Sequence, residues 1–598
     1  MPPRSNLRDA IDTRIAAGDT AAALRLLSDL LRTEPTSATA AFAVSRYESL
    51  RNSENFSSYR LAILRSFTLE PVIPLLKAAA FSYGIALEVQ LGDFNAYPQE
   101  LLDPKSTLYS FAPDTVILAV EGRDLTSANS HSPASSLAES LQAWIATFRG
   151  NSAANLVVHN LRPAPGVPHE SIDCMNQDLQ QICQNHYGVY LLDYSSLAAR
   201  FADWHDETKW VAARMPIRAS RLPHLVNEWL RFVVPLAGRA AKVLVTDLDN
   251  TLWRGVVGED GIDGIRIDPE FGSVQRVLLD LQQQGLLLAI CSKNNSEDAM
   301  GVLLQHPRMI LRPEHFASMR INWGDKAQNL REIAAELNLG LDSFAFLDDS
   351  PRERALIRAA LPQVTVIELS SEPTGYAGTI RESPPLSRIA STSEDRRRTE
   401  LYARENRRST EEISFPTKED FLRSLEQEVE VSRACAATIP RISQLTQKTN
   451  QFNLTTHRYT EAQIAEIAAR PGWQVLSLRA QDRFGDHGIV GVAITHDDGD
   501  ICEIDSLLLS CRVFARGIET ALLSYIASCA STRGIKSLRG YFIVTRKNAP
   551  AQNFYAQHGF TQAGDANGSL WHLRLEDTQI ACPEWIKLSG LSETEIES

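Results

Sequence analysis

Three short apolar segments in the middle of the chain each run directly into polar, chemically active residues, and this arrangement constrains the fold more than any other feature. VLVT at 243–246 leads into two aspartates, LLLAIC at 286–291 leads into a serine, and FAFL at 344–347 leads into two more aspartates. Longer amphipathic segments separate them, which predicts parallel strands alternating with helices. Because the carboxyl ends of parallel strands open on one crevice, we expect these polar residues to form a single site. They are Asp247, Asp249, Ser292, Asp348 and Asp349.

The length of 598 residues and the changes of pattern along the chain predict a multidomain α/β protein. Helical periodicity marks the N-terminus, strands and helices then alternate in two successive stretches, and a turn-rich, highly charged stretch precedes a last segment of mixed strands and helices. The expected parts are a helical prefix (1–55), an α/β domain (56–238), a Rossmannoid α/β domain with a parallel sheet (239–372), a linker with a charged helix (373–428), an α+β domain (429–578) and a tail (579–598).

Composition restricts the class of protein. The chain is 44% hydrophobic and 22% charged, as in soluble proteins with sizeable cores. Its net charge of −13 disfavours non-specific nucleic-acid binding, and no apolar run approaches the ~18–20 residues of a membrane helix. The eight cysteines include no CxxC pair, and the N-terminus has no continuous apolar signal segment. We therefore expect a cytoplasmic enzyme with no membrane or nucleic-acid partner.

The central site contains the residue types that bind a divalent cation and a phosphate. Two aspartates one residue apart repel each other unless positive charge lies between them, and Mg²⁺ favours carboxylate and phosphate oxygens. Ser292 can bond a phosphate oxygen, and Lys326 supplies a point charge for an anion. The alternative is an ordinary turn after each strand, because Asp and Asn are common in turns.

The order of these motifs resembles the haloacid dehalogenase superfamily: strand–Asp-x-Asp-x-Thr, strand–Ser, Lys and strand–Asp-Asp within about a hundred residues. The resemblance implies a phosphatase in which Asp247 is the nucleophile and Asp249 is the general acid and base. It also implies an Mg²⁺ site and a phosphate-binding set. The metal residues would be Asp247, Asp249, Asp348 and Asp349, and the phosphate-binding residues would be Thr251, Ser292 and Lys326, with Thr251 orienting the loop.

The longer sequences around the motifs, TDLDNTLWRGVVGEDG, ICSKNN, INWGDKAQNL and FLDDSPRER, closely resemble the FkbH-like branch of that superfamily. The resemblance runs from about Tyr59 to Leu573. It implies that a glyceryl group from 1,3-bisphosphoglycerate is loaded onto an acyl carrier protein, which supplies a three-carbon polyketide unit such as methoxymalonyl. Cys291 matches the cysteine that forms the acyl-enzyme in that family.

Two features around Cys291 bear on this function. Only about 40 residues separate Thr251 from Ser292, too few for a separate cap domain, which suits a bulky substrate such as a carrier protein. Lys293, Lys326 and a metal ion near Cys291 would lower its pKa. The alternative is a buried strand cysteine that acts as a small hydrophobe. Two other functions therefore remain open: a phosphatase for another phosphorylated small molecule, and a non-catalytic scaffold that binds a carrier.

The N-terminal α/β region resembles a degenerate SGNH hydrolase. Ser66 follows the first expected strand, where that family carries its nucleophile, but Leu-Arg-Ser replaces Gly-Asp-Ser. A serine hydrolase needs a histidine base with an acid that orients it, and no terminal Asp-x-x-His motif is evident. His159 and Asn160 could be remnants of such a site. We therefore expect a non-catalytic docking or lid domain.

The C-terminal region resembles the GNAT acyltransferase fold. RVFARG at 512–517 approximates the pyrophosphate loop of that fold, whose amides at a helix start can hold phosphate. The later segment TRKNAPAQNFYAQHGF resembles its strand–helix signature. The resemblance implies that this region binds the phosphopantetheine arm of the carrier. The residues expected to do so are Arg512, Gly517, Asn548 and Tyr555.

Overall fold

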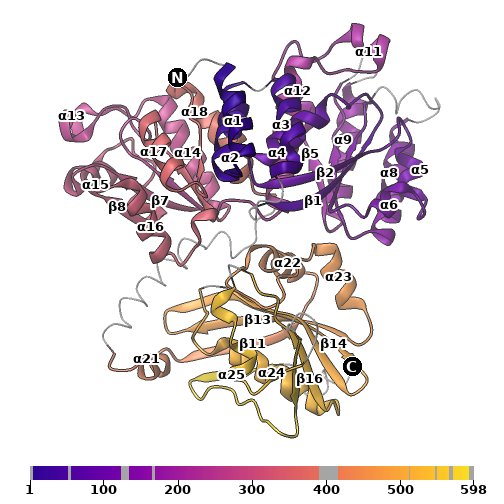
Figure 1. The fold of residues 1–598 in the computed structure, drawn as a ribbon, viewed down its shortest axis with the longest axis vertical. Helices are drawn as coiled ribbons and strands as arrows, with labels where there is room; N and C mark the ends of the chain where they lie inside the picture. The colour runs from indigo at the N-terminus through magenta and orange to yellow at the C-terminus, as the bar shows by residue number, and fades with distance from the viewer. Residues whose placement is uncertain are drawn as a thin grey trace. The chain divides into compact units, whose positions relative to one another are not determined.

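The structure is a computed structural model that describes residues 5–34, 36–50, 56–122, 133–163, 169–389, 415–510, 512–545, 548–563 and 570–590. The chain forms two compact units. The first unit comprises Met1–Ala240 and Glu382–Ile389, and the second comprises Ala241–Arg381 and Ala390–Ser598. Figure 1 shows their helices and strands.

The first unit contains a parallel five-stranded sheet in the order β2-β1-β3-β4-β5, preceded by three helices. The strands are β1 (Ser57–Arg65), β2 (Ile85–Leu91), β3 (Thr115–Ala119), β4 (Asn155–His159) and β5 (Val189–Leu192). The helices are α1 (Ser5–Ala16), α2 (Thr20–Thr33), α3 (Ser37–Leu50), α4 (Val72–Phe81), α5 (Tyr97–Leu102), α6 (Thr107–Phe111), α8 (Pro133–Asn151), α9 (His169–Gln184), α10 (Tyr194–Ala199), α11 (Glu207–Ala213) and α12 (Leu222–Leu236).

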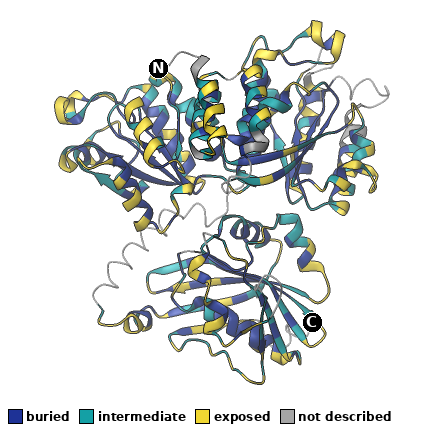
Figure 2. Ribbon diagram, viewed as in Figure 1, coloured by how far each residue is buried: buried dark blue, intermediate teal, exposed yellow. Residues whose placement is uncertain are grey.

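Helices cover both faces of this sheet, as its continuous apolar strands require. Helices α4 and α12 contribute to the core on one face, and α8 and α9 contribute to the core on the other. In the region of the expected helical prefix, α1–α3 pack together and share a small core with Ala78 and Phe81 of α4. In Figure 2 the strands are mostly buried and the outer faces of the helices are exposed.

The residues of the expected degenerate hydrolase site lie in the interior of this unit. Ser66 is fully buried, and its hydroxyl accepts a hydrogen bond from the backbone of Glu121 at 2.8 Å. His159 accepts the indole N–H of Trp229 at 2.8 Å, and burial lowers its pKa to about 3. His159 is thus neutral and held in the core.

The second unit begins with another parallel five-stranded sheet, in the order β10-β9-β6-β7-β8. Its strands are β6 (Val243–Thr246), β7 (Leu287–Ser292), β8 (Phe316–Ile321), β9 (Phe344–Leu347) and β10 (Thr365–Val366). Its helices are α13 (Val257–Gly264), α14 (Pro269–Gln283), α15 (Ser296–Gln305), α16 (Lys326–Glu336), α17 (Pro351–Ala360) and α18 (Tyr376–Glu382). The three strands predicted around the central motifs are therefore confirmed, and they are neighbours in the order β9-β6-β7.

The C-terminal part of this unit contains a nine-stranded, mostly antiparallel sheet in the order β17-β18-β16-β15-β14-β13-β11-β19, with β12 paired to β15. Its strands are β11 (Gln427–Arg433), β12 (Phe452–Asn453), β13 (Trp473–Asp482), β14 (Gly485–Asp498), β15 (Ile501–Leu509), β16 (Ser537–Tyr541), β17 (Thr561–Gln562), β18 (Leu570–Arg574) and β19 (Ile586–Ser589). Its helices are α21 (Lys418–Ser424), α22 (Ile439–Lys448), α23 (Glu461–Ala469), α24 (Ile518–Thr532) and α25 (Phe554–Gln557).

Two sequence expectations about this region need comment. The tail expected from residue 579 is wrong in part, because Ile586–Ser589 form β19 and pair in parallel with β11. The signal for this strand is weak, since only its first residue, Ile586, is buried. The charged helix expected within 373–428 lies outside the described residues.

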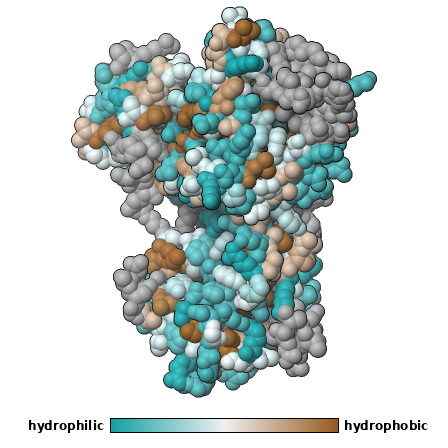
Figure 3. All heavy atoms as spheres, turned by 90° about the vertical axis from the view of Figure 1, so that its right-hand side faces the viewer, coloured by the Kyte–Doolittle hydropathy of each residue, from teal (hydrophilic) through white to brown (hydrophobic). Residues whose placement is uncertain are grey.

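The described part of the chain contains no helix that is both long and apolar enough to cross a membrane. On the face drawn in Figure 3, hydrophobic residues form small separate patches among hydrophilic ones.

Candidate active site

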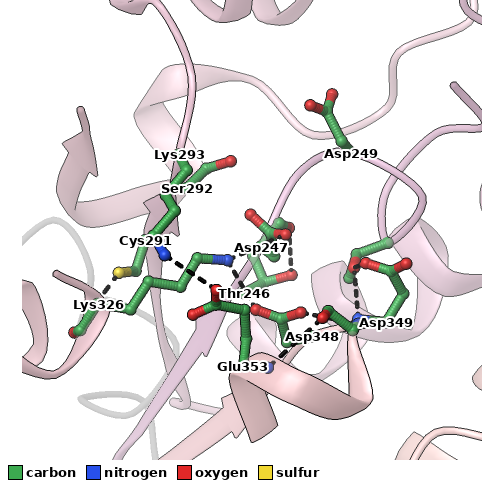
Figure 4. Close-up of polar contacts among 12 residues, drawn as sticks. Thr246, Asp247, Asp249, Cys291, Ser292, Lys293, Lys326, Asp348, Asp349 and Glu353 are labelled. Atoms are coloured by element: carbon green, nitrogen blue, oxygen red, sulfur yellow. Dashed lines mark hydrogen bonds and ion pairs between the residues drawn. The ribbon is translucent and has the colours of Figure 1, made fainter. Parts of the chain in front are cut away.

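The parallel pairing of β9, β6 and β7 brings the predicted polar residues to one edge of the central sheet. The backbone N–H of Asp247 donates to the carbonyl of Leu347 at 2.9 Å, so the residue after β6 lies beside the end of β9. Ser292 ends β7, which pairs with β6 on its other side. The polar residues that follow these three strands therefore lie at one edge of the sheet (Figure 4).

Three carboxylates meet at this edge. Asp247, Asp348 and Asp349 each offer an oxygen, and these oxygens lie within 4.8 Å of one another. Asp348 is fully buried, and Asp247 Oδ1 is buried with no hydrogen-bond partner among the described residues. Burial, followed by the charge of Asp247, raises the pKa of Asp348 to about 6. Crowded carboxylates with an unpartnered oxygen are the donor set that a hard divalent cation favours, so these three residues could hold one.

Lys326 supplies the positive charge nearest to these carboxylates. Its ammonium lies 3.1 Å from Asp247 Oδ2 and 2.7 Å from Asp348 Oδ2, and only 3% of the side chain is exposed. Burial opposes the charged form, but Asp247 and Asp348 outweigh it and raise the pKa of Lys326. Lys326 is therefore cationic at neutral pH, and it occupies one oxygen of Asp247 while leaving the other available.

Asp249 is held apart from the three carboxylates, as Figure 4 shows. Its Oδ1 accepts the indole N–H of Trp253 at 2.9 Å and the backbone N–H of Val257 at 3.2 Å, and its Oδ2 accepts from Asn294 at 3.0 Å. Burial raises the pKa of Asp249, as a proton donor requires. Asn250, which follows Asp249, adopts a positive φ of 53°, and its side chain accepts from the backbone of Gly255. The carboxylate of Asp249 is not part of the cluster that could hold a metal among the described residues.

The hydroxyl of Thr251 links the loop after β6 to the loop after β9. It accepts the backbone N–H of Asp349 at 3.1 Å and donates to Asp349 Oδ1 at 3.4 Å, and Thr251 is fully buried. This agrees with the expected role of orienting the loop. Because its hydroxyl already bonds Asp349, Thr251 acts here through that carboxylate and makes no contact suited to phosphate.

Two residues that complete the site were missed in the sequence. The amide of Asn294 donates to both Asp249 and Ser292, and the guanidinium of Arg354 donates to the backbone carbonyls of Asp348 and Asp349, each at 2.7 Å. Both lie in the quoted motifs ICSKNN and FLDDSPRER. Their proximity to the strand ends was the available signal, but sequence spacing alone does not show which way a polar side chain points.

Cys291 lies in the core directly beneath this site. It is fully buried in the same apolar cluster as Leu287 and Ala289, and its Sγ faces the backbone carbonyl of Lys326 at 3.9 Å. The expected lowering of its pKa is wrong, because burial outweighs the charge of Lys326 and raises the pKa of Cys291 to about 12. Lys293 does not offset this burial, since its ammonium pairs with Glu353 at 2.9 Å.

The residues expected to bind a phosphopantetheine arm lie within the C-terminal sheet domain, where their contacts are with other parts of the chain. Arg512 is buried and donates to Ser510 at 3.4 Å. Gly517 directly precedes α24 with a φ of 90°, and a Cβ there would lie 3.1 Å from Pro583. The fully buried Asn548 donates to two backbone carbonyls at 3.0 and 2.9 Å. Tyr555 is also buried, and its hydroxyl makes no hydrogen bond within the described residues.

Another segment of the chain, around Leu454, lies between β15 and β16 beyond the residues through which these strands pair. These parallel strands pair only through Ile501–Ile504 and Ser537–Gly540. Beyond that point the backbone N–H of Leu454 donates to Leu507, and the N–H of Ile543 donates to Leu454. An extended ligand could reach this interval only by displacing the segment around Leu454.

Comparison with solved structures relates the chain to a phosphatase-containing protein. The N-terminal part of protein BF1531 from Bacteroides fragilis, whose crystal structure contains a phosphatase domain complexed with Mg, matches with 24% identity and a TM-score of 0.53. The match covers 58% of this chain and 99% of that one. More than half of this chain therefore shares its fold. No protein-family model and no curated protein sequence matches.

Acetyltransferases match a smaller part of the chain. The ribosomal-protein-S18-alanine N-acetyltransferase from Escherichia coli matches with 18% identity and a TM-score of 0.20, over 25% of this chain and 94% of its own. A putative GNAT-family acetyltransferase from Desulfovibrio desulfuricans matches with 15% identity and a TM-score of 0.20, over 25% of this chain and 99% of its own.

Proposed function

We propose that this chain is an Mg²⁺-dependent phosphatase of the haloacid dehalogenase type that transfers a phosphoryl group to Asp247. The observation that carries the proposal is the convergence of Asp247, Asp348, Asp349 and Lys326, with Asp247 Oδ1 buried and free of hydrogen bonds in the described structure. Phosphoryl transfer depends mainly on positioning and charge neutralisation, and this cluster provides both. The Mg complex of the Bacteroides fragilis protein supports the choice of metal.

Asp247, Asp348 and Asp349 would hold Mg²⁺, which neutralises negative charge on the phosphate when bound. Asp247 is the nucleophile, because Lys326 holds Oδ2 and leaves Oδ1 to form a bond to phosphorus. The bond from phosphorus to the leaving oxygen breaks, and protonated Asp249 gives that oxygen its proton. Asp249 then takes a proton from the water that releases phosphate from Asp247.

The Asp247→Asn variant tests this function. The wild-type chain should release phosphate from acetyl phosphate with Mg²⁺, and chelation of the metal should stop the release. Asp247→Asn should lose at least a hundredfold in rate, because an amide is a poor nucleophile. Phosphate release that is equal in the wild type and this variant would refute the proposal and favour a carrier-binding scaffold.

The finer proposal is that the substrate is 1,3-bisphosphoglycerate and that an acyl carrier protein receives the glyceryl group. The resemblance of the central motifs to the FkbH-like branch supports it, as does the position of Cys291 beside Lys326. The Cys291 thiolate would attack the acyl carbon and form a 3-phosphoglyceryl thioester as the acyl phosphate leaves. Asp247 would remove the remaining 3-phosphate, and the carrier thiol would then displace Cys291 from the glyceryl group. This chemistry requires a state in which Cys291 is exposed and ionised.

Mass spectrometry tests the finer proposal, and the chain offers a matched control. Cys435 is exposed, and hydrogen bonds from Thr438 lower its pKa. Incubation with 1,3-bisphosphoglycerate should add one glyceryl mass that Cys291→Ala abolishes and Cys435→Ala retains. An adduct that is lost only in Cys435→Ala would show that the acyl group is on Cys435, and would contradict the role of Cys291. Absence of any wild-type adduct would leave a phosphatase for another phosphorylated small molecule.

A further inference from the structure

Lys293 forms an ion pair across the strand edge that carries the site. Its Nζ lies 2.9 Å from Glu353 Oε1. Lys293 directly follows β7, whereas Glu353 lies in the first turn of α17, which follows β9. These two strands flank β6 on opposite sides, and adjacent strands are about 4.8 Å apart. The ion pair therefore spans the end of β6, the strand that leads into Asp247 (Figure 4).

Both ends of this ion pair are anchored to residues of the site. On one side, Lys293 directly follows Ser292, the residue that ends β7. On the other side, the backbone N–H of Glu353 donates to Ser350 Oγ at 3.4 Å, and the backbone N–H of Ser350 donates to Asp348 Oδ1 at 2.9 Å. The ammonium of Lys293 therefore has a fixed place at the site before any substrate binds.

The ammonium of Lys293 keeps hydrogen-bonding capacity for a ligand. An ammonium has three N–H donors, and within the described residues that of Lys293 bonds only Glu353. The Lys293 side chain is 37% exposed, whereas that of Lys326 is 3% exposed and held by two carboxylates. An ion pair as exposed as that of Lys293 is weak. A group with more negative charge than a carboxylate can therefore compete with Glu353 for the lysine.

A substrate with one phosphate does not require Lys293. The phosphoryl group that reacts with Asp247 has Lys326, Ser292 and the proposed metal ion to receive its charge. A second anionic group on the same substrate needs a cation of its own, because the carboxylates of the site repel it. Arg354 cannot serve this purpose, since its guanidinium donates to two backbone carbonyls. Lys293 is the cation at the site that has free N–H donors for such a group.

We propose that Lys293 is a specificity residue that binds a second anionic group of the substrate, so that the site selects compounds in which a short chain joins two anionic groups. The inference rests on the proposed phosphatase function, because it assigns the other end of the same substrate. It is compatible with 1,3-bisphosphoglycerate, in which three carbons join two phosphates. Glu353 is a positioning residue, since it acts by holding the ammonium of Lys293 at the site.

Calorimetric titration of the full chain with two non-hydrolysable probes tests the proposal, with Mg²⁺ in large excess over the probes. Propane-1,3-bisphosphonate and propylphosphonate share a phosphonate and a three-carbon chain, and they differ in the second phosphonate. The wild type should bind the bisphosphonate roughly tenfold or more tightly, as expected of one hydrogen bond between charged groups. The two identical ends of the bisphosphonate by themselves account for only about twofold.

Three variants identify the residue responsible. Lys293→Met should reduce the preference to about twofold and leave the affinity for propylphosphonate unchanged. Glu353→Gln should keep the preference, because the amide oxygen still accepts a hydrogen bond from the ammonium. Lys536→Met is the matched control, since Lys536 also pairs with a carboxylate, that of Asp500 at 2.6 Å, but lies in the C-terminal sheet domain. This control should bind both probes as the wild type does.

A wild-type preference of no more than about twofold would overturn the proposal, and so would a larger preference that survives Lys293→Met. Equal weakening of both probes in Lys293→Met and in Glu353→Gln would overturn it too, since that result indicates an ion pair that only joins two loops. The binding assay requires no turnover, so the two proposals fail separately. If the wild type releases no phosphate from acetyl phosphate yet shows the Lys293-dependent preference, the phosphatase function fails and the specificity role stands.

Discussion

Replacement of Lys326 by methionine is the perturbation that most directly tests the electrostatics of the site. The ammonium is almost fully buried between Asp247 and Asp348, at 3.1 and 2.7 Å. Methionine has a similar length and no charge, so the variant keeps much of the packing. It leaves two buried carboxylates without their cation, and Asp349 adds a third negative charge nearby.

The expected loss of stability is large. Removing one partner of a buried ion pair costs about 3–5 kcal/mol, because the remaining charge stays buried and uncompensated. For a domain of this size, that loss lowers the melting temperature by roughly 10 °C. Lys293→Met is the matched control, since Lys293 pairs with Glu353 at 2.9 Å but is 37% exposed. An exposed pair contributes about 1 kcal/mol at most, so this control should shift the melting temperature by about 3 °C or less.

Thermal unfolding in a chelating buffer provides the measurement. The relevant transition is the one that moves when Mg²⁺ is added, which identifies the domain that carries the site. The Lys326→Met deficit should be smaller at pH 5 than at pH 8, because the unpaired carboxylates can take up protons. Mg²⁺ should also stabilise Lys326→Met more than the wild type, since the ion replaces the missing positive charge. A Lys326→Met loss no larger than that of Lys293→Met would refute the reasoning.

Three further results are expected. The pKa of Asp348 in the folded state, about 6, exceeds its ordinary value of 3.8, so the folded protein binds a proton at Asp348 more tightly than the unfolded chain does. The free energy of unfolding without metal should therefore fall as the pH rises from about 4 to about 6. Urea titrations of Asp348→Asn should show a smaller fall. Thr251→Val should weaken Mg²⁺ binding about tenfold in calorimetric titration, because Asp349 loses the hydroxyl that orients it; unchanged affinity would contradict this role. Iodoacetamide should alkylate exposed Cys435 in the native protein and reach Cys291 only after denaturation, as peptide mass mapping can check; rapid native labelling of Cys291 would show that its burial is transient.

The position of the central site could be predicted because it depends on strand ends. Parallel pairing brings the residues after β6, β7 and β9 to one edge, and the sequence showed both the apolar strands and the polar residues that follow them. Lys326 was also predicted, as a positive charge for an anion, and it lies at the start of α16. The detailed hydrogen bonds were not predictable, because Asn294 and Arg354 act through side-chain directions that depend on the three-dimensional packing.

The reactivity of Cys291 could not be predicted for a related reason. Successive side chains of a strand point to opposite faces, so Cys291 shares a face with Leu287 and Ala289, and Ser292 does not. Both faces of β7 are apolar and buried, which means that the sequence pattern does not distinguish the face that leads to the site. Lys326 is close enough to oppose the effect of burial on the thiol, but it does not outweigh that effect. The position of Cys291 near the cationic Lys326 therefore did not imply that its thiol is ionised.

The charges at the strand edge also constrain how a phosphate can enter. Asp247, Asp348 and Asp349 carry three negative charges when ionised, and Lys326, which contacts two of them, supplies a single positive charge. The cluster alone is therefore negative and repels an anion, so Lys326 cannot be the main attraction for phosphate while it is paired with two carboxylates. A bound divalent cation removes this excess and frees part of the lysine's charge for the substrate. Under the proposed function, the same carboxylates that make the apo site costly would make phosphate binding depend on the metal, so that a strongly acidic cluster could serve an acidic substrate.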